Sequence, residues 1–136
     1  MLEDALRLWT TVEPYSGYRS ATIAWRLLPA IDNGQIRLFY RSDECVGLVT
    51  WAFFTWEEFD TREYCGHEVF ARRDGEVMVF LDMIALRGRT DVLWMCREIQ
   101  DQFYVQYPHV KTAYAHRGER IGLYPSKGRC NETFAA

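Results

Sequence analysis

The hydrophobic pattern is strongest in an apolar run that begins after Glu76, ends at Leu86 and carries one interior carboxylate, Asp82. A run of this length bounded by glycine predicts a central strand buried on both faces. A carboxylate in that setting needs a hydrogen-bonding partner, because its desolvation is costly. Asp82 therefore has two interpretations. It marks a site near the carboxyl end of the strand, or it is a structural carboxylate paired with an arginine or with backbone N–H groups.

Before this strand, apolar positions at helical spacing predict short helices over residues 2–9 and 20–28. The second helix is expected to be capped by Ser20 and ended by Pro29. The apolar residues that define the buried faces of the two helices are Leu2, Leu6, Trp9, Ile23, Leu27 and Leu28.

A β-hairpin is predicted after the Asp-Asn-Gly turn signal at residues 32–34, with strands over 35–40 and 45–54. The Thr-Trp-Glu-Glu sequence at residues 55–58 matches a capping box, which predicts a helix through about Tyr64. The following stretch, up to the central strand, gives no clear pattern.

The longest amphipathic pattern follows the central strand and predicts a helix over residues 90–107, which Pro108 ends. Its apolar positions are Val92, Leu93, Cys96, Ile99, Phe103 and Tyr107. Residues 110–116 then predict a last strand beside the central one. Together they form a parallel, right-handed strand–helix–strand unit. The Gly- and Arg-rich chain from Arg117 onward is expected to form an irregular cover.

Composition narrows the class of protein. The 136 residues fit a single domain spanning 1–136, and 49% hydrophobic residues without a polar low-complexity tract argue against disorder. The net charge of −3 comes from mixed charges, so no nucleic-acid partner is expected. No stretch resembles a signal peptide or approaches the length of a membrane span. These features predict a cytoplasmic protein.

Thiols and imidazoles are scattered along the chain, so neither a disulfide framework nor a metal site is expected. Cys45 and Cys96 lie in apolar segments that suit inert core thiols. His116 is the histidine expected nearest to Asp82, either as its partner or as an ordinary strand-end residue. Trp25 and Trp51 fit either the core or an acyl-chain pocket.

The loop before the long helix, Arg87-Gly88-Arg89-Thr90, offers a second candidate site. A helix that begins after such a loop presents free N–H groups and a positive dipole end, which suit a phosphate or pyrophosphate. The alternative is that glycine and arginine serve only turn geometry and solubility here.

Three blocks of sequence resemble the RTX toxin-activating lysine acyltransferases, which attach fatty acyl groups to internal lysines of protoxins. The blocks are residues 28–31, residues 50–52, and residues 81–85 followed by Gly88. The resemblance implies an α+β fold like that of the GCN5-related N-acetyltransferases (GNAT), a three-layer α/β/α structure around a mixed central sheet. It also implies acyl-acyl carrier protein or acyl-CoA as donor substrate, no tightly bound cofactor, and a protein lysine as acceptor.

The resemblance places the family's catalytic aspartate at Asp82, but the family's catalytic histidine has no counterpart. Counting along the chain puts Tyr15 at that position, with Ser16 one step away, and no histidine precedes His67. A tyrosine or serine hydroxyl is a poor base at neutral pH. The chain is also expected to be a shortened member of the family.

Two hypotheses follow for function. In the first, the protein is an acyltransferase in which Asp82 orients the nucleophile and Tyr15 or Ser16 occupies the acid/base position. The donor phosphate then lies at residues 87–90, and the partners are acyl carrier protein and an acceptor protein. In the second, the chain keeps the GNAT-like fold without the reaction. It then serves as a structural or interaction component, for example of a phage particle, as a homo-oligomer or within an assembly.

Overall fold

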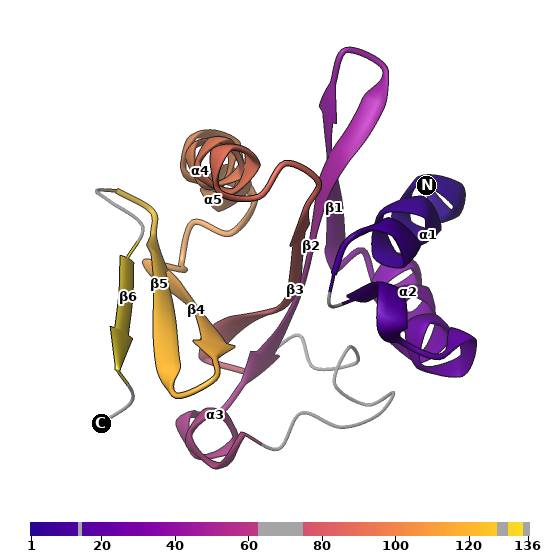
Figure 1. Cartoon of the computed structure of the whole chain (residues 1–136). Helices are drawn as coiled ribbons and strands as arrows, with labels where there is room; N and C mark the ends of the chain where they lie inside the picture. Colours follow the sequence, from indigo (N-terminus) through magenta and orange to yellow (C-terminus); the bar gives the residue numbers. More distant parts are fainter. Residues whose placement is uncertain (14, 63–74, 128–130, 135–136) are drawn as a thin grey trace.

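The computed structural model describes residues 1–13, 15–62, 75–127 and 131–134. They form a mixed sheet of six strands in the order β1-β2-β3-β4-β5-β6, with helices on both faces (Figure 1). The strands are β1 (Ile36–Arg41), β2 (Glu44–Phe54), β3 (Val77–Ala85), β4 (Thr112–Arg117), β5 (Arg120–Pro125) and β6 (Asn131–Phe134). The helical elements are α1 (Leu2–Thr11), η1 (Tyr15–Gly17), α2 (Ser20–Asp32), α3 (Trp56–Thr61), α4 (Arg89–Glu98), η3 (Ile99–Phe103) and α5 (Tyr104–Gln106).

Two hydrophobic cores lie on opposite faces of the sheet. Figure 1 shows α1 and α2 on one side of β1–β3, and α4 and α5 on the other side. The α1/α2 core includes Leu8, Trp9, Ile23, Leu27, Leu48, Ala52, Phe59, Val79 and Ile84. The α4 core includes Val49, Trp51, Met78, Phe80, Met95, Ile99, Phe103 and Tyr124. This three-layer α/β/α arrangement confirms the predicted GNAT-like fold.

The two N-terminal helices correct two expectations. The buried face of α1 is formed by Ala5, Leu8 and Trp9, whereas Leu2 and Leu6 are exposed, so the apolar stripe faces partly outward. Helix α2 runs through Pro29 to Asp32 instead of ending before it.

A Schellman motif explains where α2 ends. The Gln35 N–H donates to the Ala30 carbonyl (2.8 Å) and the Gly34 N–H donates to the Ile31 carbonyl (3.2 Å). Gly34 has a φ of 66°, the left-handed conformation this motif requires. The predicted cap at Ser20 is also wrong, because Arg19 is the N-cap and no side-chain hydrogen bond caps the helix. In the same helix, Leu28 is exposed.

The capping box at the start of α3 is confirmed. The Glu58 N–H donates to Thr55 Oγ1 (3.2 Å), and the Thr55 N–H donates to Glu58 Oε1 (3.0 Å). The helix ends at Thr61, and Arg62 follows with a φ of 58°. The rest of the predicted helix, up to Tyr64, lies outside the described residues.

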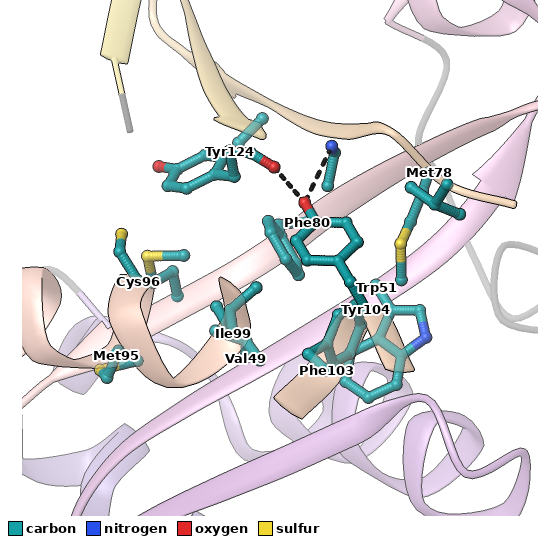
Figure 2. Close-up of a cluster of buried hydrophobic side chains, with 14 of the residues drawn as sticks. Val49, Trp51, Met78, Phe80, Met95, Cys96, Ile99, Phe103, Tyr104 and Tyr124 are labelled. Carbon is teal, nitrogen blue, oxygen red and sulfur yellow. Dashed lines mark hydrogen bonds between the residues drawn. The ribbon is translucent and has the colours of Figure 1, made fainter. Parts of the chain in front are cut away.

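The crossover helix predicted over residues 90–107 is present, but it is broken by the π-helical turn η3. This extra residue per turn brings both Phe103 and Tyr104 into the α4 core, whereas Leu93 is exposed. Figure 2 shows the Tyr104 hydroxyl between β4 and β5, where it donates to the Tyr124 carbonyl and accepts from the Ala113 N–H. The crossover helix is thereby fixed to the C-terminal strands.

The C-terminal part of the chain continues the sheet, so the predicted irregular cover is wrong. After β4, which runs parallel to β3 as expected, a turn at Gly118 (φ 63°) reverses the chain into β5. Strand β6 then pairs antiparallel with β5. The prediction gave weight to the arginine and glycine content of this segment. Its strand β5 nevertheless carries the apolar and aromatic residues Ile121, Leu123 and Tyr124.

Candidate active site

A β-bulge in β3 sets the direction of the Asp82 side chain. Thr50 pairs with Asp82 and Trp51 pairs with Phe80, so Leu81 has no opposite residue on β2. Thr50 shares the face of Leu48 and Ala52, which belong to the α1/α2 core. The Thr50 hydroxyl donates to Asp82 Oδ2 (2.8 Å) and accepts from the Asp82 N–H (3.1 Å). Asp82 therefore projects toward α1 and α2, held by a single threonine on both its backbone and its side chain.

Asp82 is a buried carboxylate, 2% exposed. Burial raises its pKa above the ordinary range, and the charges of Arg26 and Arg117 together with the Thr50 hydrogen bond act in the opposite direction. Arg26 comes from α2 and Arg117 from the end of β4, so the charges of two guanidinium groups from different elements act on one carboxylate. A carboxyl whose pKa is raised in this way is a stronger base than a solvated one.

Tyr15 lies beside Asp82. Its ring packs edge-on against Trp9, with ring centroids 5.2 Å apart, and its oxygen accepts a hydrogen bond from the Met83 backbone. Burial raises the pKa of the Tyr15 hydroxyl, and the Asp82 charge raises it further, while Arg117 lowers it. The phenol is therefore protonated at neutral pH, and its proton is available to an acceptor in the site.

Two other residues were predicted near Asp82, Ser16 and His116. The Ser16 hydroxyl donates to the Glu13 carboxylate, three residues earlier. His116 stacks on Phe59, with ring centroids 4.3 Å apart. Its pKa is lowered by burial and by Arg62 and raised by Asp60, and Asp82 is not among these influences.

The two tryptophans considered for an acyl-chain pocket differ in burial. Trp51 is 2% exposed and packs edge-on against Phe103, with ring centroids 4.7 Å apart, as a core residue does. Trp25 is 61% exposed. Cys45 and Cys96 are buried free thiols, as expected.

The loop at residues 87–90 lies at the far end of β3. Strand β3 ends at Ala85, three residues and about 10 Å beyond Asp82 at the usual strand rise, and a turn over residues 86–88 then leads into α4. The Arg87 N–H donates to Asp91 Oδ2 (2.9 Å), and Arg41 forms an ion pair with Asp91 Oδ1 (3.1 Å). A carboxylate of the chain thus already binds at the start of α4. An open cavity of about 570 Å³ beside the loop is lined by Arg7, Arg41, Ser42, Asp43, Glu44 and Arg87.

The sheet divides next to Asp82. Parallel strands β3 and β4 pair at a single position, Val79 with Tyr114. Three residues farther along β3 lies Asp82, and three residues farther along β4 lies Arg117, which donates to the Tyr124 hydroxyl (3.3 Å). Asp82 and Arg117 thus both lie beyond the position where β3 and β4 pair, and the Arg117 charge acts on both Asp82 and Tyr15.

The family model of the RTX toxin acyltransferases (HlyC) matches residues 1–123 of this 136-residue chain. The chain belongs to the RTX toxin acyltransferase family. The match extends from α1 into β5 and so contains all the residues grouped around Asp82. A search of curated proteins gave no match.

Membership of the RTX toxin acyltransferase family confirms the resemblance to this family that the three sequence blocks showed. It gives the coarse function, toxin activation by acyl transfer, which requires an acyl donor as substrate and a protein that receives the acyl group. In the ranges that the structure describes, no group of three His, Cys, Asp or Glu side chains is placed to hold a metal ion. None of the helices in those ranges is long and apolar enough to cross a membrane.

The sequence did not point to three residues of this candidate site: Thr50, Arg26 and Arg117. Thr50 belongs to one of the blocks that carried the resemblance, but its contact with Asp82 depends on strand register. Arg26 and Arg117 come from a surface helix and from a segment interpreted as irregular. Only the fold brings their charges to Asp82.

Proposed function

We propose that the protein transfers an acyl group from acyl-acyl carrier protein, or from acyl-CoA, to a protein lysine at the site formed by Asp82 and Tyr15. The observation that carries the proposal is that a protonated phenol lies beside a buried carboxylate whose pKa is raised. This pair stands where the resemblance places the family's histidine and aspartate.

In the proposed reaction, Tyr15 passes a proton to Asp82. The lysine ammonium gives a proton to the phenol oxygen while the phenol proton moves to the Asp82 carboxylate, so no free phenolate forms. The neutral amine then attacks the thioester carbonyl. A C–N bond forms, the C–S bond breaks, and the departing thiolate takes a proton released from the amine. Arg117, at the edge of the same gap, stabilises negative charge on the carbonyl oxygen.

The test is transfer from acyl-acyl carrier protein to a lysine peptide, followed by mass spectrometry. Asp82→Asn and Tyr15→Phe are expected to lower the rate at least 100-fold. Tyr18→Phe is the matched control, since Tyr18 packs in the same aromatic group as Tyr15. Transfer that persists in Asp82→Asn would refute the proposal.

A gain of activity gives a sharper test. Tyr15→His restores an imidazole that titrates near neutral pH, so the variant should transfer faster than wild type and reach its maximum at a lower pH. An inactive Tyr15→His variant that is folded by circular dichroism would argue against a base at this position.

The near-complete burial of Asp82, 2% exposed, favours a second candidate function. A filled site suits a GNAT-like domain that acts as a structural or interaction component, for example of a phage particle, as a homo-oligomer or within an assembly. Native mass spectrometry of the chain tests it: a monomer that transfers acyl groups excludes this candidate, and an inactive oligomer supports it. The donor-phosphate role of residues 87–90 remains part of the first proposal, and Arg87→Ala with Arg89→Ala should then raise the KM for the donor.

A further inference from the structure

Four aromatic rings form a cluster where α3 packs against β4, here called the α3 cluster: Trp56, Phe59, Tyr114 and His116. The Trp56 ring lies edge-on to Tyr114, with ring centroids 5.4 Å apart, and edge-on to Phe59 at 6.0 Å. Phe59 contacts Tyr114 at 5.5 Å and stacks on His116 at 4.3 Å. The cluster is thus one continuous set of ring contacts between a helix and a strand.

Exposure differs sharply within the α3 cluster. Phe59 is 2% exposed and anchors the helix, whereas Trp56 is 45% exposed at the start of α3. A large aromatic side chain fixed at its edges and open to solvent offers contact area without much loss of conformational entropy on binding. Such residues are enriched at the centres of protein interfaces.

The charges around Trp56 select the kind of partner. Glu57 and Asp60 are exposed carboxylates on the same short helix, whereas Glu58 is engaged in the capping box. Asp60 acts on His116, and Arg62 at the end of α3 acts on it more strongly, while Arg62 itself donates to the Gly118 carbonyl. The exposed carboxylates of α3 still outnumber this one cation. An aromatic face bordered by carboxylates favours a cation with an apolar stem, which describes a lysine or arginine side chain.

The α3 cluster is connected to the candidate active site through β4. Tyr114 is the β4 residue that pairs with β3, at Val79. Arg117 follows His116 directly and acts electrostatically on both Asp82 and Tyr15. A chain segment that lies on the α3 cluster is therefore next to the gap between β3 and β4.

We propose that the α3 cluster docks the cationic segment of the acceptor protein that carries the target lysine. A basic side chain of that segment lies over Trp56 and between Glu57 and Asp60. This inference rests on the proposed function for its purpose, and its test separates binding from catalysis.

The experiment measures the affinity of a fluorescent peptide that contains one central lysine flanked by lysine and arginine residues, by anisotropy with the full chain. Trp56→Ala should weaken binding about five- to tenfold, because it removes one cation–π contact. Glu57→Lys with Asp60→Lys should weaken it further and remove its salt dependence. Trp25→Ala is the matched control, since Trp25 is also an exposed helical tryptophan, 61% exposed, and should leave affinity unchanged.

The outcomes of this experiment separate peptide docking from acyl transfer. A peptide that does not bind, or that binds Trp56→Ala as tightly as wild type, overturns the docking proposal even when acyl transfer is observed. Binding that depends on Trp56 without any acyl transfer supports the docking surface and counts against the proposed function. With an active enzyme, Trp56→Ala should raise the KM for the peptide while the kcat with hydroxylamine, which needs no docking, stays unchanged.

Discussion

Replacing Thr50 by valine tests how Asp82 is held. Valine keeps the shape of threonine and opens no cavity, but it removes both hydrogen bonds that connect Thr50 and Asp82. A hydrogen bond to a charged group contributes about 1.5–3 kcal/mol, and an orphaned buried N–H costs about 1–3 kcal/mol. The free energy of unfolding should therefore fall by about 2.5–6 kcal/mol, a large fraction of the stability of a small domain.

The pH dependence of this loss identifies its cause. Because burial raises the pKa of Asp82, its contribution to stability is complete below the ordinary aspartate pKa. That contribution is lost as the pH rises through the folded-state pKa. The Thr50 hydrogen bond favours the ionised form, so Thr50→Val raises the pKa of Asp82 further and costs more at pH 8 than at pH 5.

Urea unfolding of wild type, Thr50→Val and Thr50→Ser at pH 5 and pH 8 is the assay. Serine keeps the hydroxyl and loses one buried methyl group, so Thr50→Ser should cost only about 1 kcal/mol at both pH values. A loss below about 1 kcal/mol in Thr50→Val, or a loss that is equal at the two pH values, would refute this account of Asp82.

Three further predictions concern stability. Asp82→Asn should flatten the fall in unfolding free energy as the pH rises above the ordinary aspartate pKa, since it removes the buried ionisable group; a variant with the wild-type slope would contradict this. Tyr104→Phe should lower the free energy of unfolding by about 1–3 kcal/mol through its two lost hydrogen bonds, and an unchanged urea midpoint would contradict it. Gly75→Ala should lower the Tm by many degrees because the new Cβ would lie 2.5 Å from the Phe54 nitrogen. Its control, Gly17→Ala, has no atom within 4 Å of the new Cβ and should melt like wild type.

The elements that could be predicted were those with a clear local sequence pattern. The continuous apolarity of β2 and β3 specified buried strands, and the capping box at Thr55 specified the start of α3, because both are local in the chain. The end of α2 was predicted wrongly at Pro29, because it depends on more than the local sequence. A helix end depends on the C-terminal hydrogen bonds around Gly34, and these stabilise the last turn despite the proline.

The candidate site was predictable only in part. Asp82 stood out because a carboxylate in an apolar run has a local physical cost. Its contact with Thr50 depends on a bulge at Leu81, and no local pattern announces which of two neighbouring residues a strand leaves unpaired. Arg117 was missed because its segment looked irregular, although it lies in the strand that faces Asp82.

The sheet consists of two parts that pair with each other at a single position, Val79 with Tyr114. Strands β1–β3 pair over long antiparallel registers, and so do β4 and β5, whereas this joint between the two parts has little strand pairing. The crossover helix is the second connection, and Tyr104 fastens it to the C-terminal part. Ring contacts also cross this joint, from α3 to Tyr114 and from Phe80 to Tyr124, so side-chain packing rather than strand pairing holds the two parts of the sheet together beside Asp82.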